Sequence, residues 1–209
     1  MSSMTIYCDG GVVGGNPSDL GGVWAFCDVA DGRVFHGASG VIRPFEVGLP
    51  GVSNNLSELW AAIMALEYAA RDEIPELVTL HTDSIITMRR VMDPVNAKMN
   101  GIPRAVHERL IAATQCLGII QVVLVGGHPT QADLANGFKA KNRLPVSQWN
   151  VWCDDRCNAE KELRAAELRL SAQKVRVQTA ETLLEFERKV LEISSEEASR
   201  ANFVDGQAV

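Results

Sequence analysis

Four carboxylates in this chain lie at expected junctions between one helix or strand and the next. They are Asp9, Glu58, Asp83 and Asp154. Binding groups tend to gather at such junctions, on strand ends and loops. Carboxylates brought together repel one another and their pKa values rise, so such a cluster is tolerated when a cation neutralises it. Oxygen ligands favour Mg²⁺ or Mn²⁺, and two such ions about 4 Å apart activate water for phosphodiester cleavage.

Asp9 is the most informative of the four because two glycines follow it in "YCDGG". This stretch alone is typical of a turn, since Asp and Gly are common turn residues. Beside the other three carboxylates, it instead indicates a ligand whose position is fixed by the short strand that precedes it.

The composition narrows the function classes. The chain has 209 residues, 46% of them hydrophobic, which is enough for one well-buried domain and a smaller extra element. Its net charge of −6 makes it a poor general binder of nucleic acid, although a local basic groove is compatible with that charge. Five cysteines, an odd number, predict reduced thiols and a cytoplasmic protein. No apolar run reaches the length of a membrane span, so we expect no membrane partner.

The first third of the sequence predicts three strands joined by glycine-rich turns. Apolar and β-branched residues bounded by Gly, Pro, Asn and Asp mark residues 4–10, 21–30 and 32–42. Their short connections indicate an antiparallel meander.

The rest of the sequence alternates between helices and strands. Apolar residues at helical spacing predict a helix over 54–73, with Asn54, Asn55 or Ser57 as its cap. The next elements are a strand over 76–83, a helix over 84–93, a helix over 104–118, a strand over 119–127, a polar connection over 127–148 and a helix from about 149 to about 201. This order predicts an α/β fold with a mixed sheet, antiparallel in its first half and parallel in its second.

Six sequence blocks carry a resemblance to a known family. In chain order they are "YCDGGVVGGNP", "GGVWAF", "SNNLSELWAAIMALE", "LHTDS", "VGGHPT" and "NVWCD". Each block alone is moderately specific, and the ordered set is highly specific. Over residues 4–157 the chain resembles type 1 ribonuclease H. The resemblance implies a five-stranded mixed sheet flanked by helices, and cleavage of the RNA strand of RNA–DNA hybrids that leaves a 5′-phosphate and a 3′-hydroxyl.

The resemblance also implies the roles of individual residues. The metal-binding carboxylates are Asp9, Glu58, Asp83 and Asp154. They would hold two Mg²⁺ ions, which Mn²⁺ can replace. His128 matches a histidine that assists proton transfer or product release; without the other blocks it is an ordinary loop residue. Asp155 is the alternative to Asp154 as the last ligand, and the spacing in "NVWCD" favours Asp154.

A second group of residues is expected to contact the hybrid. By resemblance, it comprises Gly10, Asn16, Asn54 and Asn55. Discriminating RNA from DNA through 2′-hydroxyls calls for short donors and acceptors such as Asn amides, and glycines let a minor groove approach the backbone. Asn54 and Asn55 have an alternative role as helix caps.

One departure from the family is an inserted loop over 129–148, before the last catalytic aspartate. It carries Lys139, Lys141 and Arg143. We expect these residues to bind phosphates of the DNA strand, or the loop to fold over the active site. The alternative is a solvated, mobile insertion.

The second departure is a helical extension over 159–209, which follows a catalytic domain over 1–158. Apolar residues recur in it every seven positions: Leu163, Leu170, Val177, Leu184 and Leu191. Such a repeat predicts a coiled-coil homodimer or a protein partner. Gln173 and Glu187 interrupt the complementary positions, and a long helix packed on its own domain, or partly exposed, is the alternative.

The sequence therefore favours an endoribonuclease that acts on RNA–DNA hybrids with two metal ions. One alternative is a nuclease of the same fold with another substrate. Another is an inactive nucleic-acid-binding module that delivers the extension to a partner. Four retained carboxylates disfavour the inactive module, because an idle acidic cluster only destabilises the fold.

Overall fold

The computed structural model describes residues 2–205, with the side chains of residues 2–189 and 191. It divides the chain into two compact units, residues 1–164 and 165–209. None of the described helices is long and apolar enough to cross a membrane. The division at 158/159 expected from the sequence, which separates the catalytic domain from the extension, stays a prediction.

Five strands form one sheet in the first unit. They are β1 (Ser3–Val12), β2 (Gly22–Ala30), β3 (Arg33–Ile42), β4 (Leu77–Thr82) and β5 (Ile119–Leu124). Their order is β3-β2-β1-β4-β5. The pairs β1–β2 and β2–β3 are antiparallel, whereas β1–β4 and β4–β5 are parallel. The predicted five-stranded mixed sheet is confirmed, and the central position of β1 gives Asp9 a neighbouring strand on one side, at Ala25.

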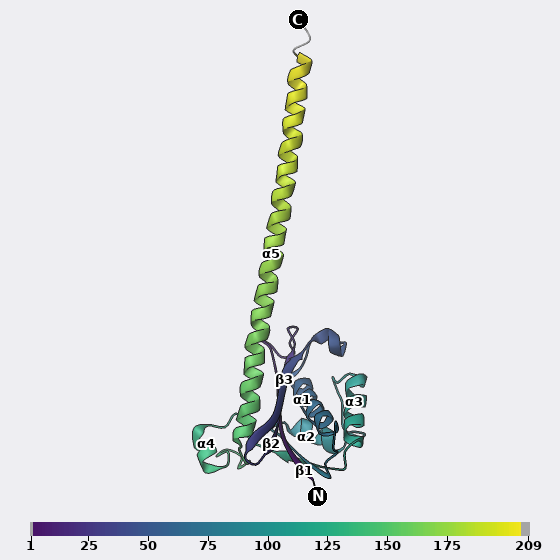
Figure 1. Ribbon diagram of the computed structural model, residues 1–209, viewed down its shortest axis with the longest axis vertical. Helices are drawn as coiled ribbons and strands as arrows, with labels where there is room; N and C mark the ends of the chain where they lie inside the picture. Colours follow the sequence, from purple (N-terminus) through teal and green to yellow (C-terminus); the bar gives the residue numbers. More distant parts are fainter. Residues whose placement is uncertain (1, 206–209) are drawn as a thin grey trace. The chain divides into compact units, whose positions relative to one another are not determined.

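Helices cover both faces of this sheet (Figure 1). The helices of the chain are α1 (Asn54–Ala69), α2 (Ile85–Met92), α3 (Arg104–Gln115), α4 (Gln131–Asn136) and α5 (Gln148–Asp205), with a 3₁₀ turn at Pro44–Val47. The larger core lies between the sheet and α1, α2 and α3. The smaller core lies on the other face, where Cys153 and Cys157 of α5 pack against Tyr7 and Ala25.

Ser53 caps α1, which corrects the expectation that Asn54, Asn55 or Ser57 would do so. The Ser53 hydroxyl accepts a hydrogen bond from the backbone N–H of Leu56. Both Asn54 and Asn55 lie inside the first turn. A cap residue needs extended backbone angles, and Ser53 has them at φ −89° and ψ 156°.

The polar connection over 127–148 contains a short helix that the sequence analysis missed. The helix is α4, and its N-cap Thr130 exchanges hydrogen bonds with Asp133 in a capping box. Asp133 also accepts a hydrogen bond from the backbone N–H of Ala140. A helix of six residues is too short to show a hydrophobic period, so Thr130 followed three residues later by Asp133 was the available signal.

The second unit consists, in its described part, of the continuation of α5 from residue 165 to Asp205. Three side chains of the seven-residue repeat, Leu170, Val177 and Leu184, are 59%, 52% and 65% exposed. The unit therefore presents an apolar stripe that no described residue covers. Partial exposure was one of the alternatives drawn from the sequence.

Candidate active site

Asp9 lies within the central strand β1 and is only 5% exposed. Its Oδ1 accepts a hydrogen bond of 2.7 Å from the backbone N–H of Gly10. Within β1, Asp9 pairs with Ala25 of β2, whereas β4 pairs with the earlier part of β1, up to Tyr7. The carboxylate is thereby held in one orientation, as a metal ligand or a catalytic group requires.

Glu58 reaches the same place from the second turn of α1. A close approach of α1 to β1 makes this possible: a Cβ atom at Gly10 would lie 2.3 Å from the backbone carbon of Ser57. Any residue but glycine at position 10 would push the helix away. Glu58 is 7% exposed, and the amide of Asn54 donates to its Oε1 at 3.4 Å.

Asp83 follows the end of β4 and completes a three-carboxylate cluster. One oxygen each from Asp9, Glu58 and Asp83 lies within 4.8 Å of the others. The Oε2 oxygen of Glu58 is buried and has no hydrogen-bond partner among the described residues. A buried acceptor without a donor is unfavourable, and a cation held by the cluster would satisfy it. The donor set therefore fits a hard divalent ion.

The cluster changes the acidity of its members. Burial, together with the charges of Asp83 and Asp154, raises the pKa of Asp9 to about 8. Burial also raises the pKa of Glu58 well above its usual range, as do the charges of Asp9 and Asp83. The pKa of Asp83 is raised by burial, although His128 opposes the rise. Without a cation, Asp9 therefore holds its proton at neutral pH, and a bound cation would displace it.

Asp154 and His128 stand beside the cluster. His128 Nδ1 lies 3.2 Å from Asp154 Oδ2, and the imidazole is 76% exposed whereas Asp154 is 22% exposed. The loop that carries His128 passes directly over Asp83, because a Cβ atom at Gly127 would lie 2.0 Å from the Asp83 carboxylate. Asp155 is exposed. Of the two adjacent aspartates, Asp154 is the one whose charge acts on Asp9 and Asp83.

Comparisons with known proteins identify the family. The RNase H family model matches residues 1–137 of this chain. The chain belongs to the RNase H family. A search of curated proteins returned no match. The match ends before Asp154, so the geometry of α5 alone connects that residue with the cluster.

Solved structures share the fold. RNase H1 from the archaeon Halobacterium salinarum NRC-1 is 19% identical with a TM-score of 0.54, covering 77% of this chain and 98% of that chain. The N-terminal RNase H domain of a Mycobacterium tuberculosis protein is 17% identical with a TM-score of 0.52, covering 75% and 97%. The foamy viral protease-reverse transcriptase, solved with dsDNA, is 15% identical with a TM-score of 0.52, covering 77% and 94%. At these identities the likeness concerns the RNase H fold.

The asparagines expected to contact substrate lie at the start of α1 and in the loop between β1 and β2. Asn16 Oδ1 accepts a hydrogen bond of 3.1 Å from the backbone N–H of Asn54 and ties the β1–β2 loop to this helix. The Asn55 side chain is exposed. Gly10 is buried under α1, where it serves the close packing described above. Substrate contact by these four residues stays a prediction.

The three basic residues of the 129–148 loop have different surroundings. Lys139 Nζ donates to the carbonyl oxygens of Gly127 and His128. Arg143 stacks over the ring of Phe138, with 4.6 Å between its Cζ and the ring centroid. Lys141 is exposed. Lys139 thus fastens the loop that carries His128, whereas Lys141 has its ammonium in solvent; phosphate binding by all three stays a prediction.

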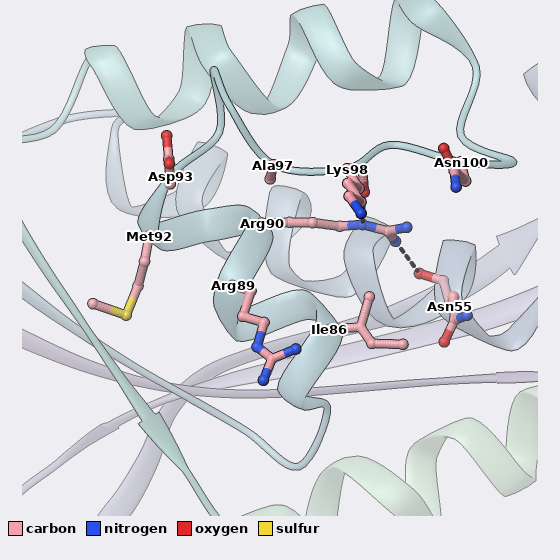
Figure 2. A pocket seen from close by; sticks show the side chains of 9 residues that line it. All are labelled: Asn55, Ile86, Arg89, Arg90, Met92, Asp93, Ala97, Lys98 and Asn100. Carbon is pink, nitrogen blue, oxygen red and sulfur yellow. Dashed lines mark hydrogen bonds between the residues drawn. The ribbon is translucent and has the colours of Figure 1, made fainter.

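A groove that sequence reasoning missed lies beside Asn55. Its volume is about 630 Å³, and it runs between α2 and the loop that precedes α3 (Figure 2). Arg89, Arg90 and Lys98 contribute positive charge to its lining. The buried Arg90 extends toward α1, where it donates to the carbonyl oxygen of Asn55 at 3.4 Å. These basic residues are close in the sequence, but the turn after α2 is what brings Lys98 to the same groove as Arg89 and Arg90.

Proposed function

We propose that this protein is an endoribonuclease that hydrolyses the RNA strand of RNA–DNA hybrids and leaves 5′-phosphate and 3′-hydroxyl ends. The observation that carries the proposal is the convergence of Asp9, Glu58 and Asp83 within 4.8 Å, with a buried carboxylate oxygen that lacks a partner, in a chain of the RNase H family. Buried carboxylates that raise one another's pKa are expected at catalytic sites.

Two Mg²⁺ ions are the proposed cofactor, and Mn²⁺ is expected to substitute for them. The residues that would hold them are Asp9, Glu58, Asp83 and Asp154. When bound, the ions would supply Lewis acidity and lower the pKa of a coordinated water. The chain contributes the fixed orientation of these carboxylates, through β1, the α1–β1 contact and the start of α5.

His128 is the proposed proton carrier. Its exposure leaves the ring accessible to substrate and solvent, and Asp154 orients it through Nδ1. The other ring nitrogen, Nε2, is then the one that exchanges a proton with the reacting groups or the departing product.

The hybrid would cross the surface beside α1. Asn16, Asn54 and Asn55 are proposed to contact the minor groove and its 2′-hydroxyls. The groove of Figure 2 adjoins Asn55, and its cationic lining suits phosphates of the DNA strand. Lys141 and Arg143 are proposed to add phosphate contacts from the 129–148 loop.

We further propose that a second copy of the chain covers the apolar stripe of α5. The support is a seven-residue repeat whose Leu170, Val177 and Leu184 are each more than half exposed. We also propose the cytoplasm as the compartment, because all five cysteines are free thiols.

Cleavage of an RNA–DNA hybrid labelled on its RNA strand tests the proposed function. Wild type with Mg²⁺ should cut this strand, and Asp9→Asn should not. Duplex DNA, duplex RNA and single-stranded RNA serve as control substrates and should stay intact. A wild type that leaves the hybrid intact with both Mg²⁺ and Mn²⁺ would contradict the proposal, and cutting of the control substrates would assign another specificity.

A further inference from the structure

Lys161 is a basic residue near the cluster to which neither the sequence blocks nor the family match assigns a role. It lies on α5 seven positions after Asp154, with Asn158 between them. Residues spaced by four and by three lie on the same face of a helix. Lys161 therefore shares the helix face that brings Asp154 to the cluster.

The side chain of Lys161 fills the space over Gly11. A Cβ atom at Gly11 would lie 2.9 Å from both Cε and Nζ of Lys161. Alternate residues of a strand point to the same face, so Gly11 and Asp9 share one face of β1, about 7 Å apart along the strand. The ammonium thus occupies the place next to Asp9 that a side chain at position 11 would take.

The ammonium is not neutralised by a carboxylate. Its hydrogen bond goes to the neutral amide of Asn158, at 3.1 Å to Oδ1, and within residues 2–189 it forms no ion pair. An ammonium has three N–H donors, and this contact uses one of them. The charge still reaches Asp9, because it opposes the rise in the pKa of that carboxyl.

We propose that Lys161 binds a non-bridging oxygen of the RNA-strand phosphate that lies next to Asp9, and so positions the substrate for cleavage. The inference rests on the proposed function and adds a residue to it. A polyanion approaching four carboxylates needs positive charge at the same place, and lysine binds phosphate as a compact point charge. Gly11 is then required because any side chain there would displace the ammonium.

The first test is the salt dependence of cleavage by the full chain with Mg²⁺. Wild type, Lys161→Met, Lys161→Arg and a control, Lys174→Met on the exposed part of α5, are compared over a KCl series. Lys161→Met should lower kcat/KM about 10-fold to 100-fold at low salt. The slope of log kcat/KM against log [KCl] should become shallower by about one, since one phosphate contact is lost. Lys161→Arg should restore most of the loss, and Lys174→Met should match wild type.

The second test uses the space over Gly11. Gly11→Ala should displace the ammonium and reproduce the loss seen in Lys161→Met. In the Lys161→Met background, Gly11→Ala should add little, because the displaced group is already absent. Additive losses would mean that the two residues act separately and would overturn this link.

An unchanged salt slope in Lys161→Met overturns the proposal, even if the melting temperature falls, because a structural residue affects stability and not phosphate neutralisation. The same series is measured as hybrid binding, by fluorescence anisotropy in the Asp9→Asn background. If wild type does not cleave hybrid, the proposed function fails while the binding slope still decides the role of Lys161. Equal binding slopes with and without Lys161 would count against it.

Discussion

The carboxylate cluster and the exposed part of α5 depart from ordinary side-chain distribution in opposite ways. In the cluster, Asp9 and Glu58 are ionisable groups that are less than a tenth exposed. In the second unit, Leu170, Val177 and Leu184 are apolar groups that are more than half exposed. Burying ionisable groups close together and exposing a row of apolar side chains are both unfavourable for a chain by itself. Each region is therefore expected to be completed by something outside the chain.

The two regions differ in how they arise. The cluster joins a strand, a helix and a strand end that are far apart in the sequence, so it exists only when the first unit is folded. The stripe on α5 follows from a local seven-residue repeat and exists wherever the helix does. Changes in the cluster should consequently alter catalysis and folding together, whereas changes in the stripe should alter association alone.

The largest effect is expected from Glu58→Gln. The change removes a ligand charge while keeping the side-chain shape, so cleavage of hybrid should fall by about a thousandfold or more, equivalent to several kcal/mol of lost transition-state stabilisation. Glu67→Gln on the same helix is the control. It breaks the ion pair with Arg109 but leaves the cluster intact. Near-normal cleavage by Glu58→Gln in a steady-state assay would contradict the assignment.

The next largest effect is expected in the pH dependence of folding stability when no divalent metal is present. Folding raises the pKa of Asp9 from about 3.9 in the unfolded chain to about 8. The folded state then binds a proton more tightly than the unfolded state. The contribution of Asp9 to the free energy of unfolding is therefore greatest below about pH 4 and falls as the pH rises toward 8.

Melting curves in EDTA between pH 5 and 8.5 check this prediction. The melting temperature of wild type should fall over this range more steeply than that of Asp9→Asn, and Mg²⁺ should remove most of the difference. If the melting temperatures of the two proteins fall in parallel in EDTA, folding does not raise the pKa of Asp9, and the prediction is wrong.

Smaller effects are expected from two lysines of the 129–148 loop, one on kcat and the other on hybrid affinity. Lys139→Ala should lower kcat about 10-fold with little change in hybrid affinity, because Lys139 fastens the loop that carries His128. Lys141→Ala should instead weaken hybrid binding and flatten its salt dependence, because its ammonium is exposed. Paired measurements of kcat and of the dissociation constant distinguish them. The same pattern in both variants would mean that Lys139 binds phosphate as well.

The smallest catalytic effect is expected in the second unit. A variant with Glu at Leu170, Val177 and Leu184 should be monomeric in sedimentation, whereas the full chain should be dimeric at micromolar concentration. The control places Glu at Val175, Thr179 and Phe186, which lie on the opposite side of the helix, and should stay dimeric. Hybrid cleavage should change less than about twofold in both. A monomeric wild type would remove the dimer proposal.

Sequence reasoning captured the elements whose signals are local. Alternating apolar residues between glycine-rich turns marked β1, β2 and β3, and helical spacing marked α1. The cap of α1 was misassigned because Ser53, Asn54 and Asn55 are all good cap residues, and only their backbone angles decide among them. The helix α4 was not predicted because its six residues are too few to show a helical hydrophobic period.

The order of residue types along the chain by itself determined the α/β class, the mixed sheet and four junction carboxylates, because hydrophobic period and turn chemistry are properties of neighbouring residues. Tertiary structure decided what each charge does. Lys139 holds the His128 loop, and Lys161 stands over Gly11 beside Asp9. These roles depend on contacts between residues about a dozen positions apart for Lys139 and more than a hundred for Lys161, and no local pattern encodes such contacts.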